Sequence, residues 1–246
     1  MRGFFAPLRM TRVLMAEKKT VSTGKRSKTV KPSSPERVAA ILDTLAQTYP
    51  GVVCALNHKN AWELTVATIL SAQCTDVRVN LVTPKLFKAF PTPKAMAAAS
   101  LPELEELIRT TGFFRNKAKS IQGAARVVTE KFGGKVPQTM EEMLTLPGVA
   151  RKTGNVVLGS WYGIAVGVVV DTHVMRLSRR LELTRETAPE KVERDLIKII
   201  PSDRWIAFSH ELIHHGRQIC VARKPRCVDC TLEKICNSGE KTWSSH

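Results

Sequence analysis

The chain has 246 residues, of which 43% are hydrophobic, so it is long enough for one large or two modest domains with a substantial core. Its formal net charge of +16 favours a polyanionic partner, with nucleic acid the first candidate and an anionic membrane surface the second. No stretch of the sequence reaches the roughly 18 apolar residues that a membrane span requires, so we expect no membrane-spanning helix.

The basic excess is concentrated at the N-terminus. Residues 1–35 contain nine Lys or Arg and a single acid, Glu17. This segment is also rich in Ser and Pro, so we expect it to form a disordered basic tail. Residues 1–16 lack acids and allow an organellar targeting peptide, the alternative being a leader without function. No secretory signal is visible, and we expect an intracellular protein, cytoplasmic or nucleoid-associated if the source is bacterial.

The elements predicted along the chain are helices. A capping residue precedes Glu by three positions at four helix starts, and these capping residues are Asn60, Ser100, Thr139 and Thr187. After the first of them, apolar residues recur at helical spacing and predict an amphipathic helix with one buried stripe. That stripe consists of Trp62, Val66, Ile69 and Leu70.

Two further helices are predicted in the middle of the chain. One contains Leu101 to Ile108 and is stopped by Gly112, and the other runs from Asn116 to Phe132 before two glycines. The only strand-like run, Val166 to Val170, leads directly into Asp171, which has the character of a helix N-cap. These signals predict an all-α fold.

The stretch Leu146 to Thr153 contains a tight turn between two helices. Pro147 and Gly148 force the turn, and the free N–H groups of the helix that follows attract phosphate. The stretch resembles a helix-hairpin-helix motif, which clamps the DNA backbone without reading its sequence. An ordinary connection between two helices is the alternative.

Two residues are candidates for chemistry. Lys152 stands in the first turn of the second hairpin helix, where the positive end of the helix dipole disfavours an ammonium and favours a nucleophilic amine. Asp171 offers a carboxylate at another helix start, where its charged form is stabilised. Surface exposure or simple capping is the alternative for each residue.

Six cysteines in an apparently intracellular chain favour metal ligation over disulfides. Four of them form the pattern C-x6-C-x2-C-x5-C, which fits either an iron-sulfur cluster or structural zinc, and they are Cys220, Cys227, Cys230 and Cys236. A basic loop between the first two could contact phosphate through Arg223, Lys224 and Arg226. We expect Cys54 and Cys74 to be small buried hydrophobic residues.

From about residue 36 to about residue 238 the sequence resembles the endonuclease III family of the helix-hairpin-helix superfamily. The motifs that carry the resemblance are the hairpin with its lysine, the terminal cysteine pattern, Ser-Ala-Gln-Cys-Thr-Asp at 71–76, Val-Asp-Thr-His at 170–173 and His-Gly-Arg at 215–217. The resemblance implies a monomeric base excision repair enzyme that acts on damaged double-stranded DNA and removes oxidised pyrimidines. It also implies a [4Fe–4S] cluster at the four cysteines, with zinc less favoured.

In this family the lysine that corresponds to Lys152 attacks C1′ of the damaged nucleotide, and the carboxylate that corresponds to Asp171 assists. The resulting imine permits β-elimination, which nicks the strand 3′ to the abasic site. In the family, the residues that correspond to Gln73 and Phe113 fill the space left by the flipped base. The alternative is that both residues are buried in the core. The other DNA contacts that we expect are Gly148, Ala150, Arg151, Thr153 and His173.

The resemblance implies two helical lobes with DNA between them. We expect a helical barrel with the hairpin at residues 54–164 and a discontinuous iron-sulfur lobe at 36–53 and 165–246. Two positions depart from the family pattern: Ala150 replaces a common glycine and resists positive φ, and Phe113 is bulkier than the common leucine.

Three rival functions stay open at this stage. An adenine-specific mismatch glycosylase would lack the lysine and add a further C-terminal domain, whereas Lys152 is present and the chain ends ten residues after Cys236. A non-catalytic DNA-binding protein would bind DNA without forming product, and an electron-transfer protein would need neither the hairpin nor the charge.

Three histidines on one predicted helix are expected to pack or cap, and they are His210, His214 and His215.

Overall fold

The computed structural model describes residues 34–245, and every regular element in that range is a helix. The all-α prediction is therefore confirmed for these residues, and the run Val166 to Val170 forms no strand. The predictions for the basic tail and its leader fall almost wholly on residues 1–33, outside the described range. At the tail's predicted end, Ser34 already caps the first helix by accepting a hydrogen bond from the Arg37 N–H.

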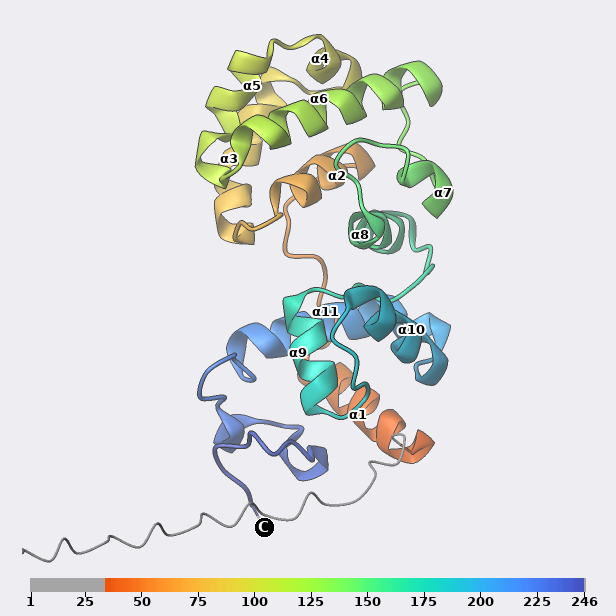
Figure 1. Cartoon of the computed structure of the whole chain (residues 1–246), viewed down its shortest axis with the longest axis vertical. Helices are drawn as coiled ribbons and strands as arrows, with labels where there is room; N and C mark the ends of the chain where they lie inside the picture. Colours follow the sequence, from red (N-terminus) through yellow and green to blue (C-terminus); the bar gives the residue numbers. More distant parts are fainter. Residues whose placement is uncertain (1–33, 246) are drawn as a thin grey trace, which may run out of the picture. The chain divides into compact units, whose positions relative to one another are not determined.

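The helices follow one another with short connections (Figure 1). Eleven α-helices and four 3-10 turns make up the described chain: α1 Pro35–Thr48, α2 Ala61–Leu70, α3 Asp76–Ala89, α4 Pro93–Ala98, α5 Leu101–Ile108, η1 Arg109–Thr111, α6 Phe114–Lys131, α7 Met140–Met143, α8 Arg151–Tyr162, α9 Thr172–Arg180, α10 Pro189–Ile199, η2 Ser202–Arg204, α11 Trp205–Gln218, η3 Cys227–Asp229 and η4 Glu233–Ile235.

Three of the four predicted capping residues cap a helix. Asn60, Ser100 and Thr139 each accept a hydrogen bond from the backbone N–H three positions later, and Ser100 with Glu103 completes a reciprocal capping box. The prediction for Thr187 was wrong, because α10 starts one residue later, with Ala188 at the N-cap and Pro189 in the first helical position. Proline fits that position because its fixed φ is already helical.

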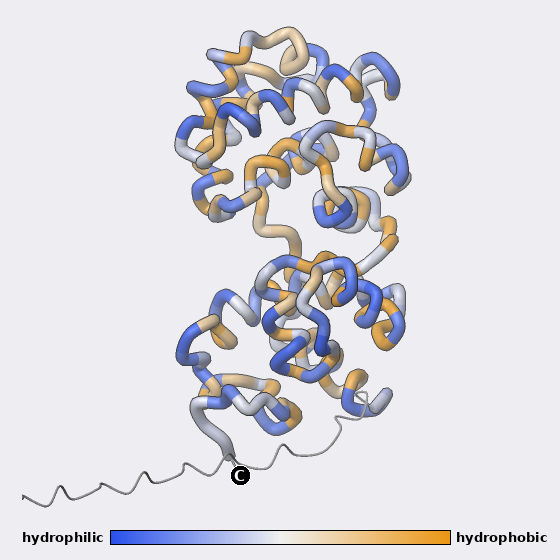
Figure 2. Tube along the Cα trace, in the orientation of Figure 1, coloured by the Kyte–Doolittle hydropathy of each residue, from blue (hydrophilic) through white to orange (hydrophobic). Residues whose placement is uncertain are grey.

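Helix α2 also differs from its prediction. A single buried stripe was expected, yet nine of its ten residues are buried, and Figure 2 shows hydrophobic segments along it between more polar positions. The reason is its central place, since it packs against α3, α6 and α8 together. The two buried threonines, Thr65 and Thr68, donate their hydroxyls to carbonyls of their own helix, so both hydroxyls are paired.

The described chain has two hydrophobic clusters. The first is built from the segment Leu56 to Leu158, which spans α2 to α8, with Val169 added. The second joins α1 to α9, α10 and α11 and takes Leu232 from the C-terminal loop. Both ends of the described chain therefore contribute to the second cluster, and α1 contacts both α11 and η4 (Figure 1). Within residues 34–245, no helix combines the length and apolar character needed to cross a bilayer.

Candidate active site and cysteine pocket

The hairpin predicted from the sequence connects α7 to α8. Gly148 has φ +79°, and a Cβ built on it would lie 2.6 Å from the Ser120 Cβ, so only glycine fits this turn. Ala150 is the N-cap of α8 with φ −102°, so this position needs no positive φ and alanine causes no backbone strain here. No side chain caps α8, so its first N–H groups are available to a phosphate.

Lys152 and Asp171 line the same pocket, although they come from different helices. Lys152 is exposed in the first turn of α8 and makes no hydrogen bond or ion pair with any residue in the described range. Asp171 is the N-cap of α9, as predicted, and its Oδ1 accepts from the N–H groups of His173 and Val174 at 2.8 Å each. The fold thus fixes the carboxylate while leaving the amine free to move.

The rest of the pocket comes from four places in the chain. It is lined by residues 71–77 after α2, by residues 170–173 before and at the start of α9, and by Met175, Pro189 and Arg217. His173 is half-buried, and its burial lowers the pKa of its imidazole despite the nearby carboxylate of Asp171. A neutral imidazole therefore faces the pocket at neutral pH.

Gln73 and Phe113 both lie on the surface, which excludes the alternative that they are buried core residues. The exposed fraction of Phe113 is 64%, and Gln73 is exposed as well. Both have left-handed backbone, with φ +51° at Gln73 and φ +46° at Phe113. Non-glycine residues adopt this conformation at an energetic cost, and such strain is concentrated at functional sites.

Two of the expected DNA contacts are engaged within the protein. The Arg151 guanidinium donates to both carboxylate oxygens of Glu193 at 2.9 and 3.1 Å, which ties α8 to α10. Asn155 donates to the same buried carboxylate at 3.0 Å. Thr153 is buried. The groups that Arg151 and Thr153 can offer to DNA are therefore their backbone N–H groups at the start of α8.

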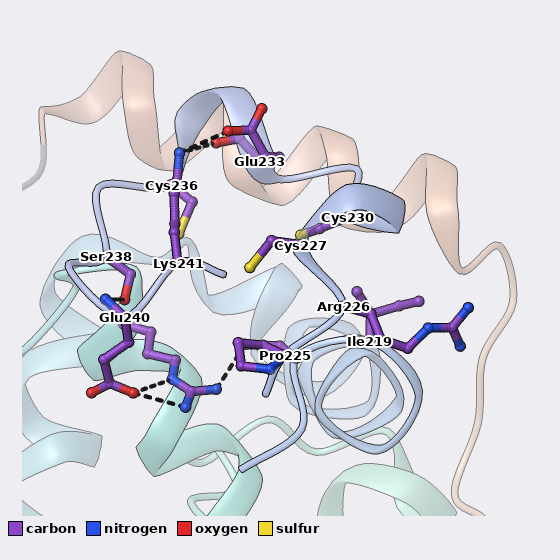
Figure 3. A pocket seen from close by; sticks show the side chains of 12 residues that line it. Ile219, Pro225, Arg226, Cys227, Cys230, Glu233, Cys236, Ser238, Glu240 and Lys241 are labelled. Carbon is purple, nitrogen blue, oxygen red and sulfur yellow. Dashed lines mark hydrogen bonds and ion pairs between the residues drawn. The ribbon is translucent and has the colours of Figure 1, made fainter. Parts of the chain in front are cut away.

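All four cysteines of the C-terminal pattern line one pocket, which we call the cysteine pocket. Figure 3 labels three of them, Cys227, Cys230 and Cys236. Three of the sulfurs have nitrogen neighbours. The Arg180 guanidinium lies 3.3 Å from Cys220 Sγ, and the Thr242 N–H donates to Cys227 Sγ at 3.4 Å. His215 Nε2 lies 3.4 Å from the sulfur of Cys230. Hydrogen-bond donors also surround the thiolate ligands of metal sites, so these contacts are typical of such ligands.

The thiols of the cysteine pocket differ in their acidity. Burial raises the pKa of Cys230 to about 12 and also raises the pKa of Cys236. Burial acts in the same direction on Cys227, but hydrogen bonds from the segment at Thr242 and the charge of Lys241 outweigh it and lower the pKa of that thiol. Buried thiols become thiolates when a cation replaces their protons, so this donor set fits a metal group.

The thiols surround a hollow instead of meeting at one point. No three His, Cys, Asp or Glu side chains between residues 34 and 245 are arranged to hold a single metal ion. The loop around the hollow is held by other contacts: Lys241 donates to Glu233 at 2.9 Å, and Arg180 pairs with Glu240 at 2.8 Å (Figure 3). The cysteine pocket therefore has a polar frame that does not depend on sulfur.

The basic loop between Cys220 and Cys227 is exposed at all three of its cations. Lys224 has left-handed backbone with φ +53°, and Arg226 pairs with Asp229 on the surface at 2.7 Å. The loop closes through the Arg226 N–H, which donates to the carbonyl of Ile219. Its cations are thus presented to solvent from a segment that begins and ends at the cysteine pocket.

The His-Gly-Arg motif links the pocket of Lys152 and Asp171 to the cysteine pocket, a role that the sequence did not reveal. Arg217 forms an ion pair of 2.6 Å with Asp76 beside Lys152 and Asp171 in their shared pocket. A Cβ on Gly216 would meet the His173 side chain at 3.0 Å, so glycine permits close packing of α11 on α9. The motif itself was visible in the sequence, but its partners are distant along the chain.

The remaining histidines and cysteines have structural environments. As expected, the helix α11 histidines pack: His210 Nε2 lies 3.1 Å from the Ser160 hydroxyl, and His215 Nδ1 lies 2.9 Å from the Tyr49 hydroxyl. Cys54 and Cys74 pack against the first hydrophobic cluster, but both are only half-buried, so full burial was the wrong prediction.

The part of the chain that contains the hairpin and the pocket matches one class of proteins. The sequence profile of the HhH-GPD superfamily base excision DNA repair proteins matches residues 66–202, more than half of the chain. Structures of the same fold include a thermostable thymine-DNA glycosylase, at 21% identity and a TM-score of 0.74. The fold and the site therefore define a base excision DNA repair protein.

Closer relatives narrow the class. The chain is 56% identical over 208 residues to an endonuclease III of Synechocystis, covering 85% of this chain and 95% of that protein, and 41% identical over 207 residues to one of Bacillus subtilis, covering 84% and 94%. It also matches an endonuclease III–DNA structure at 41% identity and a TM-score of 0.79, covering 83% of this chain and 96% of that one. The chain belongs to the endonuclease III family, the DNA glycosylases with abasic-site lyase activity.

Proposed function

We propose that this protein removes oxidised pyrimidines from double-stranded DNA and then nicks the strand, with Lys152 as the nucleophile and Asp171 as its assistant. The observation that carries the proposal is that a free lysine and a fixed carboxylate line one pocket together with residues 71–77. A similar structure is described as a trapped endonuclease III–DNA covalent intermediate, which supports a nucleophile on the protein.

The proposed reaction proceeds through a covalent bond to the sugar. The neutral amine of Lys152 attacks C1′, the bond from C1′ to the base breaks, and the base leaves with the electron pair and is protonated. The nitrogen then loses a proton and the C1′–O4′ bond breaks, with O4′ taking up a proton, so the sugar ring opens and a protonated imine forms that makes the C2′ proton acidic. Loss of that proton expels the 3′ phosphate as the C3′–O bond breaks, and water hydrolyses the imine to release the enzyme.

Asp171 is proposed to stabilise the positive charge that develops on the sugar. Its Oδ1 is occupied by the two backbone N–H groups of α9, while Oδ2 makes no hydrogen bond within residues 34–245 and is free to face the substrate. Gln73 and Phe113 are proposed to fill the space that the flipped base leaves, because both are exposed on strained loops. The first-turn N–H groups of α8, together with His173, are proposed to contact the backbone near the lesion.

We expect Asp171→Asn to separate the carboxylate's two roles. Asparagine caps helices as well as aspartate, so the free energy of unfolding should change by less than about 1 kcal/mol. The base-excision rate should fall by about 10²- to 10³-fold, because the charge opposite the developing cation is lost. Thermal unfolding and single-turnover kinetics measure the two effects. A wild-type rate in Asp171→Asn would show that the residue only caps α9.

The cysteine pocket is proposed to hold a [4Fe–4S] cluster, with zinc as the alternative. Four thiolates are the ligand set of such a cluster, and thiols placed around a hollow suit a group in which each iron binds one of them. When bound, the cluster would supply rigidity to the basic loop, whose Arg223, Lys224 and Arg226 would then contact phosphate. Metal analysis should find about four irons per chain, whereas a structural zinc site would give about one zinc.

The two hydrophobic clusters support a division into two domains. We propose a helical domain at residues 54–164 and a discontinuous cluster domain at 36–53 and 165–246. Since DNA is the substrate, we also propose that the protein works inside the cell.

Borohydride trapping tests the proposed function. The protein is incubated with duplex DNA that carries one oxidised pyrimidine, with and without borohydride. The proposal predicts a strand cut 3′ to the lesion without borohydride and a covalent protein–DNA adduct with it. Base loss without an adduct would indicate a glycosylase without a lysine nucleophile. No base loss on several lesions would favour a non-catalytic DNA-binding protein.

A further inference from the structure

A buried lysine lies outside the proposed chemistry. Lys117 on α6 is only 5% exposed, and its Nζ donates to two backbone carbonyls, that of Leu70 at 2.7 Å and that of Thr111 at 2.8 Å. Burial lowers the pKa of Lys117, so its position carries a cost that the two hydrogen bonds must offset. No acid is paired with it among the described residues.

The two carbonyls share one property, because each stands at the C-terminal end of a helix. Leu70 is the last residue of α2, and Thr111 is the last residue of η1. Carbonyls at such ends have no partner within their helix and carry the negative end of the helix dipole. A lysine amine is well suited to bind both, since it offers several donors from one atom.

A few residues after each carbonyl comes one of the two residues that are proposed to fill the space left by the flipped base. Gln73 follows Leu70 by three positions, and Phe113 follows Thr111 by two. Both residues have left-handed backbone, so each short connection is already strained and has little freedom to adjust. The Nζ atom of Lys117 therefore holds the first residues of both loops and limits the distance between the two loops.

We propose that Lys117 is a positioning residue that sets the spacing between Gln73 and Phe113. Through that spacing it matches the protein to the gap in a duplex from which a base has been displaced. The inference rests on the proposed function, since it assigns these two residues to the gap. Lys117 itself touches neither substrate nor Lys152, and it acts only through the two loops.

The test compares two substrates in the full chain with Lys117→Met, which keeps the length of the side chain and removes its donors. Duplex DNA with one oxidised pyrimidine requires the gap to be filled, whereas a single-stranded oligonucleotide with a preformed abasic site does not. We expect the single-turnover rate on the duplex to fall at least about 10-fold, because misplacement of positioning groups by about 1 Å has large kinetic effects. Borohydride trapping on the single strand should stay within about 2-fold of wild type, since Lys152 is unaffected.

Gln122→Met is the matched control. Gln122 lies on the same helix, is 8% exposed, and donates one buried hydrogen bond to the Ala99 carbonyl at 2.7 Å, away from both loops. Its loss should lower the melting temperature but leave the duplex rate unchanged. Equal losses on both substrates, or the same duplex defect in Gln122→Met, would show that Lys117 is merely structural and would overturn the inference.

A binding measurement separates this inference from the proposed function. In a Lys152→Ala background, 2-aminopurine opposite an abasic analogue in a duplex should brighten on binding, because the inserted side chains disturb its stacking. Lys117→Met should reduce that change, and Gln122→Met should not. If Lys117→Met fails to fold, Lys117→Arg, whose longer side chain displaces the loops, should show the same selective loss. An unchanged signal in the folded variant overturns the positioning role whether or not wild type cleaves DNA.

Discussion

Replacing Lys152 by alanine is expected to abolish base removal, strand cleavage and the borohydride adduct together, lowering the single-turnover rate by on the order of 10⁴-fold or more. The three losses should coincide because one amine performs the attack and then carries the imine. Stability should be unchanged, since the Lys152 side chain is exposed and makes no hydrogen bond or ion pair with any residue in the described range. Gel analysis with and without borohydride measures all three.

Lys152→Arg is the control for charge. Arginine keeps a cation at the start of α8 but does not form an imine, so DNA binding should persist while the adduct is lost. If Lys152→Ala still forms an adduct on duplex DNA, another amine is the nucleophile, and the assignment of Lys152 is wrong.

Cys230→Ser is expected to have the largest effect on stability, destabilising the C-terminal region by more than about 4 kcal/mol. The reason is the small hydrophobic content of this region: beyond Cys220, Leu232 is the only apolar residue in the second hydrophobic cluster's buried set. A bound metal group would supply most of the remaining folding energy. The iron content, the midpoint temperature of unfolding and the affinity for undamaged duplex DNA should all decrease together.

Cys54→Ser is the matched control, because Cys54 is also half-buried but does not line the cysteine pocket. It should keep its full metal content and its DNA affinity. If Cys230→Ser keeps the metal and melts like wild type, the four cysteines do not act as one ligand set.

Much of the local structure could be predicted because it depends on neighbouring residues. Asp171 was recognisable as a helix cap from its position before a polar helical segment, and the structure confirms that role. Gly148 was recognisable as a turn because few residues tolerate its conformation. Thr187 was misjudged by one position, because a proline at the first helical residue determined the start of α10 instead.

The long-range parts of the site could not be predicted in the same way. Arg217 and Asp76 are 141 positions apart, and Arg151 and Glu193 are 42 positions apart, so no local pattern pairs them. The periodicity of α2 indicated which residues are apolar, but not that neighbouring helices cover its other faces as well. Nothing in the sequence singled out Lys117, because its two partners are backbone carbonyls that have no sequence signature.

The pairing of α1 with the C-terminal segment affects how the protein is made. The Arg37 side chain donates to the carbonyl of Ile235, 198 positions further along, and the buried face of α1 packs on α11 and η4. At typical synthesis rates of about 5–20 residues per second, α1 leaves the ribosome on the order of 10 seconds or more before these partners exist. Among the described helices, the first to be synthesised is therefore one of the last to be buried, and its apolar face stays exposed to solvent until its partners have been made.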